Sequence, residues 1–263
     1  MSKMDGRTAL ITGSAMGNGF GIAKVLAKYG AKVILADISD QVEASAGQLK
    51  DEGYEATAIH MDVSDTECVQ QAVRRTIDKY GRIDALVNNA GVIRLGGLLE
   101  TTDKMRDFQF DINIKGVWNV TKAVIPFMQE RKYGRIVNMS SVTGVSVADP
   151  GECAYATTKA AIMGFTRAVA REFAKDRITC NAILPGYVQT PMADQIARES
   201  NAKDPASVTK GIADAVPLGR LATIEEIGEL AAFLASDESS YITGTPVVID
   251  GGSTLPETVS VGV

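Results

Sequence analysis

The sequence TGSAMGNGFGIA, residues 12–23, is the first indication of the fold, because it places four glycines between an apolar run and an amphipathic segment. Glycine allows a tight turn and a close approach of the backbone to a ligand. Backbone N–H groups at the start of a helix favour a bound phosphate. The spacing T-G-x-x-x-G-x-G differs from the common G-x-G-x-x-G, and glycines alone are a weak signal. The stretch therefore predicts a phosphate loop that needs support from the residues after it.

That support comes from the next apolar run, Lys32–Asp37, which ends in a carboxylate 18 residues after Gly19. An acid about 20 residues after such a loop accepts hydrogen bonds from the adenosine ribose hydroxyls. It also repels a 2′-phosphate, and no Arg or Lys occurs at 14–19 or directly after Asp37. The pattern predicts NAD(H) as cofactor, in preference to NADP(H). The plainer alternative is an Asp that caps a helix at a strand end.

Apolar runs and amphipathic segments alternate along the whole chain. Continuous apolar runs are typical of parallel strands that helices cover on both faces. The expected strands are Thr8–Thr12, Lys32–Asp37, Ala56–Asp62, Ala85–Asn88, Arg135–Ser140, Ile178–Leu184 and Pro246–Asp250. The expected helices are Gly21–Tyr29, Gln41–Glu52, the segment after Asp65, Thr102–Arg131, Ala154–Lys175 and Ile224–Ser236. This alternation predicts an α/β fold, a doubly wound parallel sheet of about seven strands in a single domain over 1–263.

The segment 186–220 breaks the alternation between two expected core strands. Its sequence is polar and compatible with helices, and Pro191 and Pro217 bound it. In this fold class ligands bind at the carboxyl edge of the sheet. An insertion at that edge predicts a lid on the substrate side of the ligand site.

The composition excludes several classes of function. A net charge of −5 gives no electrostatic case for nucleic acid or an anionic membrane as partner. No apolar run approaches the ~20 residues of a membrane span. The three cysteines are odd in number and widely spaced, which indicates reduced thiols of a cytoplasmic protein. The single histidine, His60, leaves little for a His-based triad or a zinc site. We therefore expect no metal, and proton chemistry by Tyr, Lys or carboxylates.

Tyr155 and Lys159 lie four residues apart, on one face of an expected helix. A free phenol has a pKa of about 10, too high for an efficient base near neutrality. An ammonium one helical turn away favours the phenolate, and we expect Lys159 to lower the pKa of Tyr155. Taken alone, such a pair is more often an ordinary surface contact.

The loop, the acid and the Tyr-x-x-x-Lys pair occur in the order of the classical short-chain dehydrogenase/reductase family, which the chain resembles over essentially all 263 residues. Four further matches follow the family's order. They are Asp62-Val63, the segment Asn88-Asn89-Ala90-Gly91, Asn113 in DINIKGVWNV, and the serines of GRIVNMSS. LPGYVQTPM, residues 184–192, matches the segment beside the nicotinamide. Each motif is weak alone, but the ordered set is strong and implies a Rossmann-like fold.

The resemblance assigns roles to individual residues. The implied catalytic residues are Asn113, Ser141, Tyr155 and Lys159. The implied cofactor-binding residues are Gly13, Met16, Asn18, Gly19, Asp37, Ile38, Asp62, Val63, Asn89, Ala90, Gly91, Tyr155, Lys159, Pro185, Gly186, Val188 and Thr190. Substrate would meet Ser141, Glu152, Tyr155 and Tyr187. Two departures stand out: Asn18 replaces an apolar residue of the family, and Ser140 competes with Ser141.

These expectations combine into an NAD(H)-dependent oxidoreductase that interconverts an alcohol and a ketone or aldehyde, with tyrosine as acid and base. The partner is a small-molecule substrate, and the resemblance suggests a homotetramer in which the helices of Trp118 and Tyr155 pack against other copies. The tail 253–263 would reach a neighbouring subunit. One alternative is a reductase of 3-oxoacyl thioesters, which in this family usually goes with NADPH. Another is a cofactor-binding regulatory protein with a vestigial site.

Overall fold

The computed structural model describes residues 3–255, and seven parallel strands form its central sheet. The strands lie in the order β3-β2-β1-β4-β5-β6-β7, so the chain winds outward from β1 in both directions. Their bounds are β1 Thr8–Thr12, β2 Lys32–Asp37, β3 Ala56–His60, β4 Ala85–Asn88, β5 Gly134–Met139, β6 Ile178–Pro185 and β7 Pro246–Ile249. The doubly wound parallel sheet expected from the sequence is confirmed.

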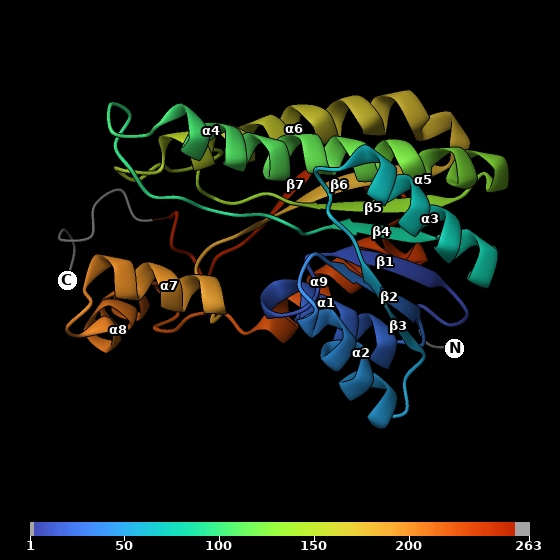
Figure 1. Ribbon diagram of the computed structural model, residues 1–263, viewed down its shortest axis with the longest axis horizontal. Helices are drawn as coiled ribbons and strands as arrows, with labels where there is room; N and C mark the ends of the chain where they lie inside the picture. The colour runs from blue at the N-terminus through green and yellow to red at the C-terminus, as the bar shows by residue number, and fades with distance from the viewer. Residues whose placement is uncertain (1–2, 256–263) are drawn as a thin grey trace.

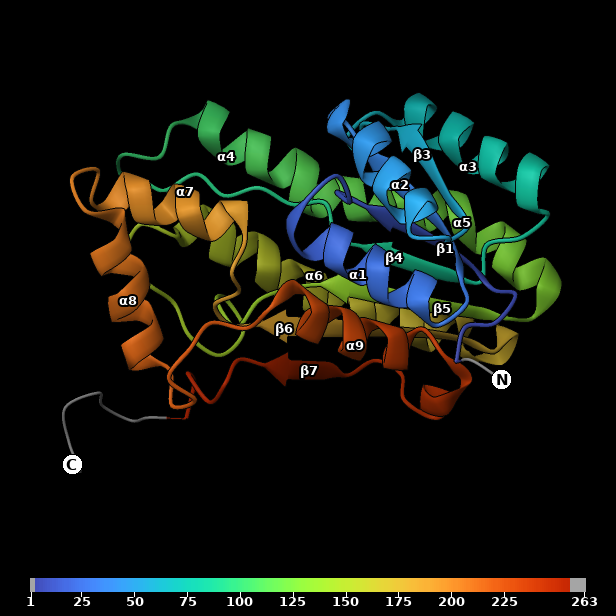
Figure 2. The same cartoon turned by 90° about the horizontal axis from the view of Figure 1, so that it is seen from below.

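Helices cover both faces of the sheet (Figures 1 and 2). One layer holds α1 (Gly17–Lys28), α2 (Gln41–Asp51) and α9 (Ile224–Leu234). The other holds α3 (Thr66–Tyr80), α4 (Asp103–Phe110), α5 (Val117–Arg131) and α6 (Cys153–Phe173). Successive strand residues point to opposite faces. In β1, Ala9 and Ile11 accordingly join the core under α1 and α9, whereas Leu10 joins the core under α3 and α5.

Two helical segments differ from expectation. Helix α1 begins at Gly17, four residues before the predicted start, so the later glycines of the loop form its first turn. The long helix predicted over Thr102–Arg131 is α4, a π-helical segment at Asp111–Gly116, and α5. A π turn has one extra residue and is common at functional sites. Hydrophobic periodicity is too coarse to reveal a single extra residue.

The segment 186–220 forms two helices, α7 (Pro191–Ser200) and α8 (Pro205–Ala215), which pack on each other. Each begins with Pro in its first turn after a capping residue, Thr190 for α7 and Asp204 for α8. They lie beyond the carboxyl ends of the strands, away from the two layers that cover the sheet (Figure 1). That these two helices act as a lid stays a prediction.

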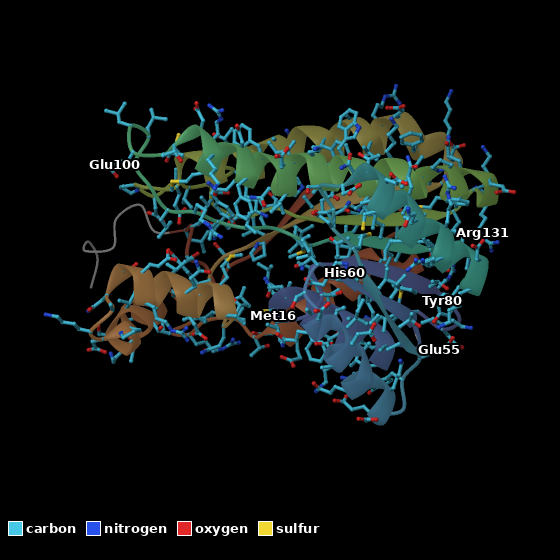
Figure 3. All side chains as sticks on the ribbon, in the orientation of Figure 1. Met16, Glu55, His60, Tyr80, Glu100 and Arg131 are labelled. Atoms are coloured by element: carbon cyan, nitrogen blue, oxygen red, sulfur yellow. The ribbon has the colours of Figure 1, made fainter. Side chains whose placement is uncertain are left out.

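In Figure 3, Met16 lies after β1 and His60 is the last residue of β3, both toward the carboxyl edge of the sheet, whereas Glu55, Tyr80 and Arg131 lie toward the amino edge. At that amino edge the charged groups pair. Asp84 accepts hydrogen bonds from the backbone N–H of Thr8 at 2.9 Å and from Arg82 Nε at 2.7 Å. Asp237 accepts from Arg7 at 2.7 Å and from Arg135 at 3.0 Å. Within residues 3–255, no helix has the length and apolar character to cross a membrane.

Candidate active site

The glycine loop between β1 and α1 has no room for side chains at two of its positions. Gly13 has φ +62°, and a Cβ there would lie 2.7 Å from the Cα of Ala90. A Cβ on Gly19 would lie 2.8 Å from the carbonyl carbon of Gly13. Asn89 holds the loop in place, because its Nδ2 donates to the carbonyls of Thr12 at 3.0 Å and Gly13 at 2.8 Å.

The carboxylate of Asp37 stabilises the same loop. Its Oδ2 accepts the N–H of Ala15 at 2.9 Å, and its Oδ1 accepts the N–H of Ser39 at 2.9 Å. Each carboxylate oxygen has two lone pairs, so these bonds leave capacity for ribose hydroxyls. Beside it, Met16 and Ile38 are exposed, at 41% and 60%. The cradle of glycines, the helix N-terminus and this acid fit a dinucleotide.

Other residues expected near the cofactor have structural contacts of their own. Asp62 accepts from Ser64, both through the backbone N–H at 2.8 Å and through the hydroxyl at 2.7 Å. Val63 is buried and packs against Gly116. A Cβ on Gly116 would lie 2.6 Å from the Cγ2 of Val63. Val63 would therefore meet an adenine through its backbone. Asn18 keeps its Oδ1 buried with no hydrogen-bond partner among residues 3–255.

The segment from Pro185 to Thr190 connects β6 to α7 beside the loop. Pro185 accepts the N–H of Val142 at 3.1 Å, and Gly186 donates to Ile249 at 3.0 Å. The side chain of Val188 is buried in the core. Thr190 caps α7, and a Cβ on Gly17 would lie 3.7 Å from the Cβ of Thr190. The glycine loop and the start of α7 thus lie against each other.

The two serines that competed in the sequence are separated by their contacts. Ser140 is buried, and its hydroxyl donates to the backbone carbonyl of Lys159 at 2.8 Å. Ser141 Oγ accepts the N–H of Thr143 at 3.1 Å, and its hydroxyl lowers the pKa of Tyr155, which places it beside the phenol. Ser140 therefore fixes helix α6 to the strand, and Ser141 is the serine that meets the tyrosine.

Burial dominates the titration of Tyr155 and Lys159. It raises the pKa of Tyr155 to about 12; the bond with Ser141 opposes the rise and the charge of Glu152 adds to it. Burial also lowers the pKa of Lys159 to about 8. The lysine Nζ lies 5.4 Å from the centre of the tyrosine ring and donates to the carbonyl of Met139 at 2.9 Å. The expected lowering of the Tyr155 pKa by Lys159 is not found: burial raises this pKa, and Lys159 is not among the groups that shift it.

Asn113 lies in the π-helical segment and is 1% exposed. Its Oδ1 accepts the N–H of Val92 at 2.8 Å. Its Nδ2 donates to the carbonyl of Val92 at 2.9 Å and to the hydroxyl of Thr158 at 3.0 Å. A Cβ on Gly91 would lie 3.4 Å from its Oδ1 and 3.5 Å from Lys159 Nζ. The side chain thus ties the segment after β4 to the helix that carries the tyrosine and lysine.

Glu152 and Tyr187, which we expected to meet substrate, share Asp149 as a charged neighbour. Burial and the neighbouring Asp149 raise the pKa of Glu152, while a hydrogen bond from Thr143 lowers it. Burial and the charges of Asp149 and Glu152 raise the pKa of Tyr187. Thr143, which acts on Glu152 and whose N–H bonds Ser141, was not predicted, because an isolated loop threonine matches no motif.

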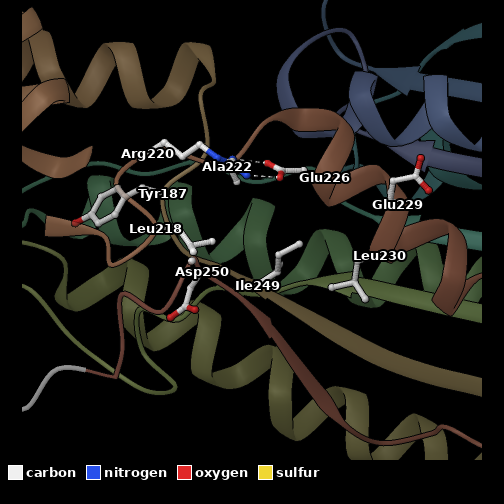
Figure 4. A pocket seen from close by; sticks show the side chains of 10 residues that line it. Tyr187, Leu218, Arg220, Ala222, Glu226, Glu229, Leu230, Ile249 and Asp250 are labelled. Atoms are coloured by element: carbon white, nitrogen blue, oxygen red, sulfur yellow. Dashed lines mark hydrogen bonds and ion pairs between the residues drawn. The ribbon is translucent and has the colours of Figure 1, made fainter. Parts of the chain in front are cut away.

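A cavity of about 380 Å³ lies next to this site (Figure 4). Tyr187 forms part of its wall together with Leu218, Ile249 and Asp250, and the Arg220–Glu226 ion pair spans another side. Tyr187 is therefore shared between this cavity and the tyrosine site. Within residues 3–255, no group of three His, Cys, Asp or Glu side chains could hold a metal ion.

Comparison with known proteins places this geometry in a family. Residues 13–254 match the family model described as enoyl-(acyl carrier protein) reductase. The chain is 62% identical over 263 residues to oxidoreductase UcpA of Salmonella typhimurium, with both chains fully covered. The chain belongs to the short-chain dehydrogenase/reductase family. It is an oxidoreductase of that family, whose members use a nicotinamide cofactor.

Relatives of lower sequence identity are named for different activities. The chain is 37% identical over 251 residues to 3-oxoacyl-(acyl-carrier-protein) reductase FabG of Thermotoga maritima, covering 95% of this chain and 98% of that one. The structure of levodione reductase superposes with a TM-score of 0.93 at 33% identity, over 96% of this chain and 99% of that one. The aldohexose dehydrogenase of Thermoplasma acidophilum gives 0.91 at 29% identity, over 100% and 99%. The family assignment from the sequence is confirmed.

Proposed function

We propose that this protein interconverts an alcohol and a ketone or aldehyde with NAD(H), using Tyr155 as the acid and base. The observation that carries the proposal is Tyr155 with Ser141 beside it and the buried Nζ of Lys159 5.4 Å from its ring centre, at the edge of the sheet where the glycine loop lies. With its pKa near 12, the phenol holds its proton at neutral pH and is ready to protonate a carbonyl oxygen. A bound nicotinamide would supply the hydride in reduction and accept it in oxidation.

The other residues of the site orient and support this tyrosine. Ser141 would hydrogen-bond the substrate oxygen and so hold the carbonyl carbon toward the cofactor. Lys159 would hold the ribose hydroxyls and, with an oxidised cofactor, favour the phenolate. Asn113 fixes the segment after β4 against α6 and would hold a water near Lys159. Helices α7 and α8 would close over the substrate as a lid.

The proposed preference for NAD(H) rests on Asp37. Its carboxylate follows β2 beside the glycine loop, where it would accept bonds from ribose hydroxyls and repel a 2′-phosphate. Steady-state kinetics with both reduced cofactors test the preference: we expect kcat/KM for NADH to exceed that for NADPH by about tenfold or more. A preference for NADPH would contradict it.

The second candidate is reduction of 3-oxoacyl thioesters, which the similarity to FabG favours. Asp37 speaks against it, if such a reductase requires NADPH. A regulatory protein with a vestigial site is less consistent with the structure, because the four proposed catalytic side chains come together in one place. The assembly we propose is a homotetramer in the cytoplasm, with the exposed Trp118, which packs on Phe165 at 5.5 Å, covered by another copy.

Replacement of Tyr155 by Phe tests the proposed function. Removal of the hydroxyl takes away the proton donor, so turnover of any alcohol or carbonyl substrate should fall by about 10³-fold or more, while NADH binding changes little. Tyr241→Phe is the matched control, because Tyr241 is fully exposed. Turnover is measured by NADH absorbance and binding by NADH fluorescence. Retained turnover in Tyr155→Phe would remove the tyrosine from the mechanism.

A further inference from the structure

Glu152 presents a carboxylate to the proposed active site from a fixed position. It is the residue before helix α6, three positions before Tyr155, and its backbone carbonyl accepts the N–H of Ala156 at 2.7 Å. Within residues 3–255 its Oε2 is buried and has no hydrogen-bond partner. An unpaired buried oxygen is destabilising, so packing alone does not account for a glutamate here.

Glu152 lies close to the groups that would hold the reacting oxygen. Thr143 is beside the carboxylate of Glu152 and lowers its pKa. The backbone N–H of Thr143 donates to Ser141 Oγ at 3.1 Å, and Ser141 in turn lowers the pKa of Tyr155. A single residue therefore separates the carboxylate from the Ser141–Tyr155 pair.

The charges around this position are mostly negative. Asp149, on the same loop, and Glu152 both act on Tyr187, which comes from the connection after β6. Glu152 also acts on Tyr155. Lys159 is also close to Tyr155: its Nζ lies 5.4 Å from the centre of the tyrosine ring and donates to the carbonyl of Met139 at 2.9 Å. A substrate at Tyr155 would thus meet a negative potential on the side of Glu152, where a second anion is repelled.

On the basis of the proposed function, we infer that Glu152, supported by Asp149, selects the substrate class: neutral or cationic carbonyl compounds and alcohols with a second hydroxyl or amino group near the reacting carbon. The second group would donate a hydrogen bond to the carboxylate. A site built to pair with such a donor discriminates against an analogue that lacks it. A carboxylate or phosphate at the same place would be rejected by repulsion.

Three ketones of similar size test this selection with NADH: 3-hydroxy-2-butanone, 2-butanone and acetoacetate. For the unaltered protein we expect kcat/KM to fall in that order. In Glu152→Gln, the ratio of acetoacetate to 2-butanone should rise about tenfold, because the carboxylate charge is gone while the side chain keeps its shape. Asp149→Asn, on an exposed loop, should shift the ratio in the same direction by less. Glu130→Gln, exposed on α5, is the control with the same charge change and should leave the ratios unchanged.

Equal ratios in the unaltered protein, Glu152→Gln and Asp149→Asn would overturn the inference, as would a preference of the unaltered protein for acetoacetate. Asp149→Asn keeps the test valid if Glu152→Gln does not fold. NADH fluorescence titration, run in parallel, separates the two proposals. A protein that does not bind NADH contradicts the proposed function. A protein that binds NADH but turns over none of the three ketones overturns the substrate class alone.

Discussion

The amino edge of the sheet pairs its charged groups with opposite charges, whereas Lys159 and Glu152 at the carboxyl edge form no ion pair within residues 3–255. At the amino edge, Asp84 is 1% exposed and bonded to Arg82 and to the backbone of Thr8. At the carboxyl edge, Lys159 is 5% exposed and donates to a backbone carbonyl. Among residues 3–255, buried oxygens of Asn18 and Glu152 there have no partner.

The difference shows what each edge contributes. Paired buried charges resist change, because removal of one partner leaves the other desolvated and uncompensated. Unpaired polar groups are unfavourable in the folded chain, but they are available to a ligand. The amino edge therefore stabilises the fold, and we interpret the carboxyl edge as a site that is stabilised only when cofactor and substrate bind.

The largest stability effect should come from the amino edge. Asp84→Asn removes the charge that faces Arg82 and Arg7 and should lower the free energy of unfolding by about 3 kcal/mol, because the arginines stay partly exposed and the loss lies at the low end for a buried pair. Urea denaturation measures it. Exposed Glu130→Gln is the control and should change stability by less than about 0.5 kcal/mol. A loss in Asp84→Asn no larger than the control would remove the contrast between the edges.

A smaller effect should separate the neighbouring serines at the carboxyl edge. Ser141→Ala removes the hydroxyl that meets Tyr155 and should lower turnover about 10²-fold with little change in stability. Ser140→Ala removes the bond to the Lys159 carbonyl and should lower stability by about 1 kcal/mol with a modest loss of turnover. Steady-state kinetics and urea denaturation of both variants measure the losses of turnover and of stability. The reverse assignment would make Ser140 the residue at the substrate.

The sequence was a good guide wherever a short-range pattern determines structure. Apolar runs located all seven strands, and glycine spacing located the phosphate loop. The order of the motifs also correctly predicted that Ser141, Tyr155 and Lys159 lie near one another. The π-helical segment was missed, since Asn113 is held there by the backbone of Val92, a contact across 21 residues. Residues 256–263 of the tail 253–263 lie outside the described residues, so the expectation that the tail reaches another subunit stays a prediction.

The pKa values were the least predictable feature, because desolvation depends on everything packed around a group. Spacing on a helix correctly indicated that Tyr155 and Lys159 are neighbours. It carried no information on the burial that raises one pKa and lowers the other. The same holds for Glu152, whose neighbours Thr143 and Asp149 come from a loop without a motif.

Replacement of Lys159 by Met tests whether the carboxyl edge holds its buried charge at the expense of stability. The lysine pKa falls from 10.5 to about 8 on folding, which corresponds to about 3 kcal/mol against the folded state below pH 8. The variant also loses the hydrogen bond to the Met139 carbonyl, which reduces its expected gain in stability by about 1 kcal/mol. Between pH 8 and 10 the unfolded chain holds more protons, so the unaltered protein gains stability as pH rises and the variant does not.

The free energy of unfolding of both proteins, measured by urea denaturation at pH 7 and at pH 9.5, gives the answer. We predict that Lys159→Met is inactive and about 2 kcal/mol more stable than the unaltered protein at pH 7, with the difference close to zero at pH 9.5. A variant that is less stable at pH 7, or whose difference does not change with pH, would contradict the account.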